Sequence, residues 1–268
     1  MKKGFITNKY TISVCILLAI LAVDIILHKG MSRVILPETF TTLRAPQTGL
    51  LSCSNPLLNR GKQWQKAVNT PALAAALPAS VNGVEMDLYF DSSANSFFVY
   101  HDSAQMSNIK LEEILSTLME RGIHASLWLD CKNLSMENVP AALNKLCSLR
   151  SSYALHNRML VESPNIACLP AFCDSGFYTS YYTPFFNPYN EPEALLVERI
   201  DSMSKLLKRY PVSALSGYYF QAPFLLKYFP EFPILTWADK AGMSVVGNLF
   251  TYKMEAQKNI HIVLYPAD

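Results

Sequence analysis

The sequence has few charged residues and no excess of either sign. Charged side chains make up 16% of the 268 residues, and 23 basic residues against 21 acidic ones leave a net charge of +2. A nucleic-acid-binding domain usually carries a clear basic excess, so we expect no nucleic acid partner. Half of the residues are hydrophobic, which excludes a wholly disordered chain.

Glycine and paired cysteine motifs are also scarce. With only 10 Gly, a collagen-like repeat is excluded. None of the six cysteines forms a Cys-x-x-Cys pair, which argues against zinc-ribbon and thioredoxin-type motifs. Cys168 and Cys173 are close enough in the chain to form a disulfide, although connectivity cannot be deduced from sequence. Cys53 ends a segment similar to a lipoprotein acylation box, but it lies too far beyond the apolar N-terminal run to be one.

The longest apolar run lies near the N-terminus. Residues 12–27 are apolar except for Ser13 and Asp24. Together with Tyr10 and Thr11 they would form about 27 Å of helix, near the lower limit for crossing a membrane. We expect Asp24 to lie at the outer interface of such a span.

The flanks of this run indicate how it is used. No small-x-small cleavage site follows it, which favours an uncleaved anchor over a signal peptide. Three lysines precede it and predict a cytoplasmic N-terminus: Lys2, Lys3 and Lys9. We therefore expect a transmembrane anchor over 1–29, a linker over 30–50, and a domain over 51–268 outside the cytoplasm, which in a Gram-negative bacterium is the periplasm.

The remaining sequence alternates between short β-rich runs and helical patterns. Such alternation predicts parallel strands joined by helices. Eight strands favour a closed TIM-like (β/α)8 barrel, with a doubly wound sheet as the alternative. The predicted strands are 64–68, 84–90, 125–130, 158–162, 177–181, 214–218, 234–237 and 261–264. The predicted helices are 111–121, 136–149, 191–209 and 222–229.

Acidic residues gather near the ends of three consecutive predicted strands. Glu85 and Asp87 alternate on one strand and so face the same side. Asp130 ends the next strand, Lys132 follows on the same face, and Glu162 ends the third. In a barrel the chemistry lies at these strand ends, and clustered carboxylates suit a hard divalent cation. Alternatively, these acids cap the following helices or pair with Lys132.

Two further residues are candidates for the same site. His101 ends a short strand just after the strand that carries Glu85 and Asp87, and histidine is the usual general acid or base near neutral pH. Trp237 ends the seventh strand and could line a pocket, although an aromatic residue at a strand end can equally belong to the core.

Two consecutive segments carry a recognisable pattern. Gly83-Val84-Glu85-Met86-Asp87 is followed by Asp91 and then by Val99-Tyr100-His101-Asp102. This resembles the glycerophosphodiester phosphodiesterase family, whose pattern runs G-x-E-x-D, an acidic turn, and a strand ending in His-Asp. Leu129-Asp130-Cys131-Lys132 resembles that family's next strand, E-x-K, with Asp for Glu.

Weaker likenesses extend over the rest of the chain. Val68-Asn69-Thr70 resembles the menorin-type branch of this PI-PLC-like phosphodiesterase superfamily. Leu235-Thr236-Trp237 resembles a late strand of the family, with a Trp-Thr pair in reverse order. The resemblance implies a TIM-like barrel and a divalent cation, Ca²⁺ or Mg²⁺.

The resemblance also implies roles for individual residues. Glu85, Asp87 and Asp130 match the metal-ligand positions. Lys132 matches a basic residue near the phosphate, and His101 matches one of two histidines that share the acid–base work. This agrees with the chemistry, since an anionic phosphodiester needs a cation to offset its charge and an acid to protonate the leaving alkoxide.

The sequence departs from the family at its first histidine. That residue should fall at the end of the first strand, where Lys66 stands, and Ala67 takes the place of a following Arg. Lys66 could bind a phosphate oxygen. A lysine beside carboxylates keeps its proton, so it fits an acid or an anion-binding group better than a base. The other interpretation of Lys66 is an ordinary exposed residue.

Two functions follow from these patterns. The first is a membrane-anchored, metal-dependent phosphoric diester hydrolase acting on a small or lipid-derived phosphodiester. The second is a catalytically degenerate barrel that binds a phosphorylated or polyol ligand in the cell envelope. The missing first histidine favours the second, whereas the presence together of the acids, Lys132 and His101 favours the first.

Overall fold

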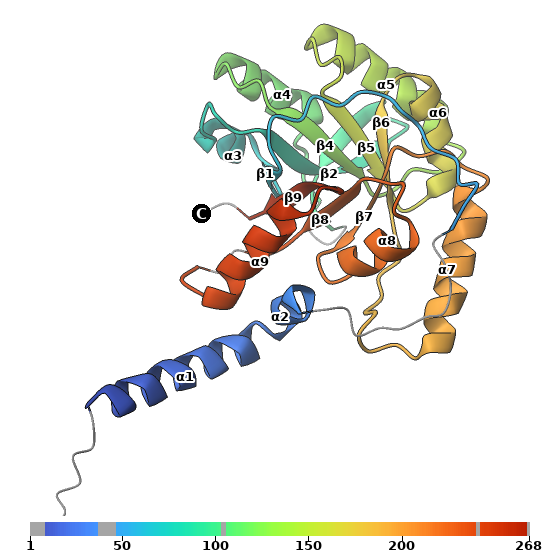
Figure 1. Ribbon diagram of the computed structural model, residues 1–268. Helices are drawn as coiled ribbons and strands as arrows, with labels where there is room; N and C mark the ends of the chain where they lie inside the picture. The colour runs from blue at the N-terminus through green and yellow to red at the C-terminus, as the bar shows by residue number, and fades with distance from the viewer. Residues whose placement is uncertain (1–8, 37–46, 103–105, 240–241, 267–268) are drawn as a thin grey trace, which may run out of the picture.

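The chain forms a closed barrel of eight parallel strands (Figure 1). The computed structural model describes residues 9–36, 47–102, 106–239 and 242–266. The first strand pairs with both the last and the second, which closes the sheet. This confirms the predicted barrel rather than a doubly wound sheet. The barrel strands are β1 (Gln63–Gln65), β2 (Gly83–Asp91), β4 (Ser126–Cys131), β5 (Met159–Ser163), β6 (Tyr178–Tyr182), β7 (Ala214–Tyr218), β8 (Ile234–Trp237) and β9 (Ile260–Tyr265).

Each barrel strand matches a predicted one within a few residues. The largest difference is at β1, which ends at Gln65 instead of continuing to Val68. Ala67 adopts a left-handed backbone with φ of 57°, and an alanine in that conformation cannot continue an extended strand. The short strand predicted to end at His101 is β3 (Ser96–Val99), which ends two residues earlier and pairs antiparallel with β2. His101 follows it and lines the barrel mouth.

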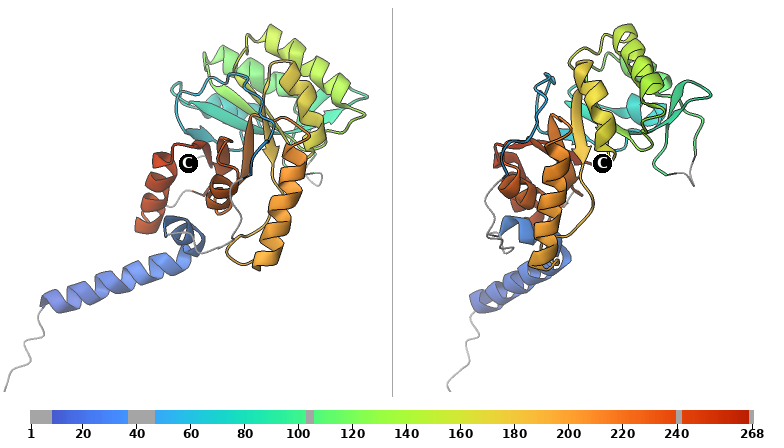
Figure 2. Two further views of the ribbon diagram at one scale, coloured as in Figure 1. Left: turned by 45° about the vertical axis from the view of Figure 1, so that its right-hand side comes forward. Right: turned by 90° about the vertical axis from the view of Figure 1, so that its right-hand side faces the viewer.

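Helices cover the outside of the barrel (Figures 1 and 2). The four predicted helices are present, but two begin later than expected. α5 begins at Val139 instead of 136, with a proline in its first turn. α7 begins at Glu193, directly after Pro192. The helices of the barrel are α3 (Pro71–Ala76), α4 (Leu111–Glu120), α5 (Val139–Ser152), α6 (Leu169–Asp174), α7 (Glu193–Leu207), α8 (Ala222–Tyr228) and α9 (Val245–Ala256).

The inside of the barrel is filled by a layer of apolar side chains below the strand ends. Gly83 at the start of β2 is required by this layer, since a Cβ there would lie 2.1 Å from the Trp64 ring. Asp130 and Glu162 lie above this layer, two residues beyond Trp128 on β4 and Leu160 on β5. The members of the layer are Trp64, Trp128, Leu160, Ala214, Leu235, Ile262 and Leu264.

The N-terminal segment forms two helices joined at a sharp bend. α1 (Lys9–Leu27) leads away from the barrel, and α2 (Lys29–Ile35) packs on α9 through buried Met31 and Val34 (Figure 1). Within the described ranges, no single helix is long and apolar enough to cross a membrane. The pair of α1 from Thr11 and α2 has sufficient length and apolar character, but is bent by 97°.

The expected linker over 30–50 thus begins with a helical turn in contact with the barrel. Its central part, 37–46, lies outside the described residues, as do Lys2 and Lys3. The boundaries of the expected segments stay predictions.

One disulfide ties the segment before β1 to the outer helices. Cys53 is bonded to Cys173, across 120 residues of sequence. The suggested Cys168–Cys173 pair is therefore not formed, and Cys168 is a buried free thiol. The partner of Cys173 depends on the closed barrel, which brings the chain before β1 beside the end of α6.

Removing this disulfide is expected to destabilise the domain strongly. A cross-link that closes so long a loop contributes roughly 3–5 kcal/mol, mainly by restricting the unfolded chain. We expect the Cys53→Ser/Cys173→Ser variant to melt roughly 10 °C lower in thermal unfolding. Cys147→Ser, at a half-buried free thiol, is the matched control. Equal melting of both variants would contradict the prediction.

Candidate active site

The carboxyl ends of three neighbouring strands place acidic side chains side by side. Asp87 on β2 pairs in register with Asp130 on β4, and Asp130 pairs with Glu162 on β5. Glu85 lies two residues before Asp87 and faces the same side. All four are buried, with exposures from 1% to 7%. The strand register therefore forms one acidic layer above the apolar layer of the barrel.

Lys132 joins two of these acids. Its Nζ lies 2.8 Å from Asp87 Oδ1 and also donates a hydrogen bond to the carboxylate of Asp130. Burial alone would lower the pKa of Lys132, but Asp130 and Asp87 together raise it above its ordinary value. The ammonium is therefore a fixed positive charge at the edge of the acidic layer.

Asn69, in the loop after β1, holds the second oxygen of Asp87. Its Nδ2 donates to Asp87 Oδ2 at 2.7 Å, and its Oδ1 accepts from the Asp87 backbone N–H at 3.0 Å. This two-point contact fixes the orientation of the Asp87 carboxylate. Asn69 was not among the predicted site residues, although it belongs to the Val68-Asn69-Thr70 motif just beyond the first predicted strand.

The carboxylate of Glu85 is held by a backbone N–H in the loop after β1. Its Oε2 accepts from the Ala67 N–H at 2.7 Å, which the left-handed conformation of Ala67 directs into the barrel. Burial raises the pKa of Glu85 to about 8, and the nearby Asp87 and Asp130 add to the effect. Without a cation, this carboxyl therefore holds a proton at neutral pH.

The acidic layer fits a hard divalent cation. Glu85, Asp87 and Asp130 each offer one carboxylate oxygen, and these oxygens lie within 4.8 Å of one another. Asp130 Oδ1 is buried and accepts no hydrogen bond from the described part of the chain. Once Glu85 gives up its proton, three buried carboxylates face one Lys132 ammonium, and carboxylate oxygens are the ligands that Ca²⁺ and Mg²⁺ prefer.

A cavity at the mouth of the barrel brings all the predicted site residues together. Lys66 and His101 line it, together with Lys132 beside the acids. The sequence left open whether Lys66 belongs to the site or is an ordinary exposed residue. In the structure it lines the cavity. The His101 side chain is 68% exposed, with Nδ1 3.8 Å from Asp102 Oδ2. The lining includes Lys66, Glu85, Asp87, His101, Asp130, Lys132, Glu162 and Trp237.

The wall opposite the acids is aromatic. Tyr182, Tyr218 and Trp237 stand at the ends of β6, β7 and β8 and line the cavity. Trp237 contacts both tyrosines, with ring centroids 5.3 Å from Tyr182 and 4.8 Å from Tyr218. Burial raises the pKa of Tyr182 to about 12. The cavity can therefore hold a ligand with a charged end on the acids and lysines and an apolar part on the rings.

The raised pKa of Glu85 predicts how cation binding depends on pH. Because the folded protein holds this proton up to about pH 8, whereas an unfolded chain releases it near pH 4.5, the metal-free fold loses stability as pH rises from about 4.5 to about 8. A cation must displace the proton and so binds more tightly at high pH. We expect the rise in Tm on adding CaCl₂ to grow over this interval. A rise that stays constant across pH would contradict the prediction.

The sequence comparisons give no family. No model of a known protein family matches the chain, and no curated protein matches it either. Similarity is found instead among solved structures, at sequence identities low enough that only the fold is shared.

Three structures share the barrel over most of its length. A protein from Silicibacter pomeroyi DSS-3, assigned as a glycerophosphoryl diester phosphodiesterase, is 13% identical, with a TM-score of 0.54 over 81% of this chain and 92% of its own. A glycerophosphodiester phosphodiesterase from Parabacteroides distasonis ATCC 8503 is 15% identical, with a TM-score of 0.50 over 80% and 93%. A protein from Galdieria sulphuraria with the same assignment is 12% identical, with a TM-score of 0.50 over 78% and 94%. The chain therefore has the TIM-barrel fold that these phosphodiesterase structures display.

Proposed function

We propose that the protein is a membrane-anchored, cation-dependent phosphodiesterase that acts on a glycerophosphodiester or a related diester. The observation that carries this proposal is the buried trio of Glu85, Asp87 and Asp130, with Lys132 beside it, at the mouth of a barrel with this fold. Neither a capping role nor a simple ion pair requires three buried carboxylates around one ammonium.

The residues of the cavity divide the work of hydrolysis. A divalent cation held by the acidic trio would offset the charge of the phosphate. Lys132 and Lys66 both line the cavity and can bind phosphate oxygens there. His101 is exposed to solvent at the rim and can protonate the leaving alkoxide, then exchange its proton with water.

The anchor is supported by the surface of α1. Its large apolar side chains from Ile12 to Leu27 are between 38% and 74% exposed, an extent that soluble surfaces rarely show. The Cys53–Cys173 disulfide suits an oxidising compartment. We therefore place α1 in a membrane and the barrel on its extracytoplasmic side.

The direct test is hydrolysis by the full chain. Glycerophosphoethanolamine and a chromogenic phosphodiester would be offered with Ca²⁺, Mg²⁺ or Mn²⁺, and with a chelator. We expect turnover that requires a cation and disappears on chelation. Turnover that persists after exhaustive chelation would contradict the cation-dependent site.

A second function is favoured by one observation. No histidine lies between His28 and His101, so Lys66 stands where a second acid–base residue would be expected. A binding barrel without catalysis would show no turnover in this assay, while divalent cations would still raise its Tm. That result would favour a barrel that binds a phosphorylated or polyol ligand.

A further inference from the structure

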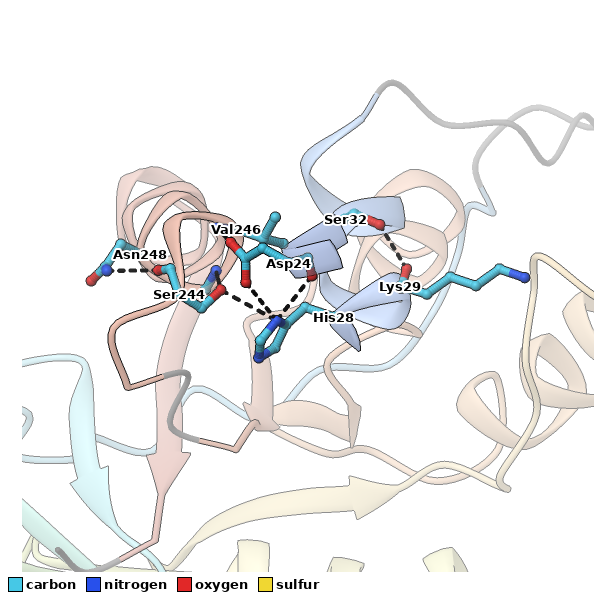
Figure 3. Close-up of polar contacts among 8 residues, drawn as sticks. Asp24, His28, Lys29, Ser32, Ser244, Val246 and Asn248 are labelled. Atoms are coloured by element: carbon cyan, nitrogen blue, oxygen red, sulfur yellow. Dashed lines mark hydrogen bonds and ion pairs between the residues drawn. The ribbon is translucent and has the colours of Figure 1, made fainter. Parts of the chain in front are cut away.

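The C-terminal end of α1 packs on the side of the barrel where the cavity opens. Asp24 near the end of α1 accepts a hydrogen bond from the Val246 N–H at 3.0 Å, in the first turn of α9. His28 lies 2.9 Å from Asp24 and 3.3 Å from the Ser244 hydroxyl (Figure 3). Because α9 follows β8, its N-terminus lies at the face where the strands end, which is the face of the cavity.

Two more loops of the same face contact α2. Gly30 packs so closely on Tyr219, in the loop after β7, that a Cβ would lie 2.4 Å from its hydroxyl oxygen. Arg33 donates to Asn190, in the loop after β6, at 2.7 Å. The anchor is thus fixed to the loops after β6, β7 and β8, whose strands carry the aromatic wall.

The contact with α9 lies within the apolar part of α1. Beyond Asp24, Ile25, Ile26 and Leu27 are still 44%, 72% and 74% exposed. The first turn of α9 therefore lies beside the part of α1 whose exposed side chains need an apolar environment. A membrane that covers these side chains also reaches the rim of the barrel beside α9.

That rim has its own exposed apolar side chains. Val245 and Leu249, one turn apart on the outer face of α9, are 55% and 51% exposed. Phe185, in the loop after β6, is 61% exposed. Lys29 and Arg33 of α2 add positive charge suited to anionic headgroups, and the Lys29 side chain extends away from the α9 contact (Figure 3).

An aromatic path connects this rim with the cavity. Trp237 and Tyr218 line the cavity 4.8 Å apart, and Phe185 contacts Tyr218 edge-on at 5.0 Å. The path begins opposite the acids and ends at an exposed ring. It has the direction and character that an acyl chain would need to run from the cavity to the lipid surface.

We propose that the mouth of the barrel faces the membrane surface and takes a phosphodiester whose glycerol still carries an acyl chain. This rests on the proposed hydrolysis. Water attacks the phosphorus, one P–O ester bond breaks, and the headgroup alcohol leaves with a proton, so that the lipid keeps a phosphomonoester. The phosphate would lie on the cation and lysines, and the acyl chain along Tyr218 and Phe185.

A pair of substrates that differ in one acyl chain tests the substrate class. The full chain would be reconstituted in vesicles of phosphatidylethanolamine and phosphatidylglycerol, and given lysophosphatidylethanolamine or glycerophosphoethanolamine. We expect kcat/KM to be at least tenfold higher for the lipid. Phe185→Glu should lower that ratio about tenfold. Met119→Glu, at a 58% exposed side chain near the end of α4, should leave it unchanged. Equal rates for both substrates would overturn the inference and leave the proposed function standing.

The orientation is tested without catalysis. Trp would be introduced as Val245→Trp or Met119→Trp, and its fluorescence compared with wild type in vesicles containing brominated lipid. We expect quenching of the tryptophan at 245 and none at 119, since α4 ends at the opposite face of the barrel. Equal quenching, or quenching only at 119, would overturn the proposed orientation. If neither substrate is hydrolysed, the proposed function fails, and this measurement still decides the orientation.

Discussion

Glu85→Gln is expected to lower phosphodiester turnover at least about 1,000-fold and to remove the stabilisation by divalent cations. The amide has the shape of the carboxyl and can still accept the Ala67 N–H, so the local fold is kept. It cannot supply a negatively charged ligand. Losing the charge stabilisation by the cation costs several kcal/mol in the transition state, and each 1.36 kcal/mol is tenfold in rate.

Thermal unfolding separates this effect from damage to the fold. Burial and neighbouring acids hold the pKa of Glu85 near 8, so Gln is close to the protonated form already present at neutral pH. The variant should therefore melt at or above the wild-type temperature without cations, and CaCl₂ should no longer raise its Tm. Glu112→Gln is the matched control, because Glu112 pairs with Lys145 outside the barrel. A variant that keeps both turnover and the cation-dependent Tm would rule out Glu85 as a ligand.

The strands and the acidic layer could be predicted because their signals are local. Buried parallel strands appear as short, nearly continuous apolar runs, and acids at the ends of such runs interrupt the pattern. Asp87, Asp130 and Glu162 were visible in this way, and the register then aligned them in neighbouring positions. The barrel itself follows from eight such runs separated by helices.

The features that escaped prediction depend on contacts between distant segments. Cys53 reaches Cys173 only because the barrel closes. Asn69 became part of the site through its contact with Asp87, which the loop after β1 determines.

α9 was missed for a different reason, since it is apolar on two faces. Val246, Phe250 and Met254 are buried, whereas Val245 and Leu249 are exposed. Such a helix has no single apolar stripe of the kind that marks an amphipathic helix. The second apolar face has no partner in the described part of the barrel, which is consistent with the membrane contact proposed for it.

Lys66→His is expected to raise phosphodiester turnover about 100-fold. Lys66 follows β1 and lines the same cavity as His101, so a histidine at position 66 would face the same ligand. An ammonium group can bind phosphate or donate a proton, but it has no free position to accept one. A neutral imidazole can accept a proton from the attacking group while His101 supplies one to the leaving alkoxide. A positioned acid or base contributes about 10² to 10⁴ in rate.

The double variant Lys66→His/His101→Ala decides whether the gain comes from paired acid–base groups. If it does, kcat should fall back to the wild-type level or below, and the single variant should show a bell-shaped pH profile that the double variant lacks. An unchanged rate in Lys66→His, with the cation-dependent Tm intact, would mean that Lys66 is not what limits the chemistry. The barrel would be one that only binds its ligand if wild type and Lys66→His both showed no turnover while divalent cations still raised their Tm.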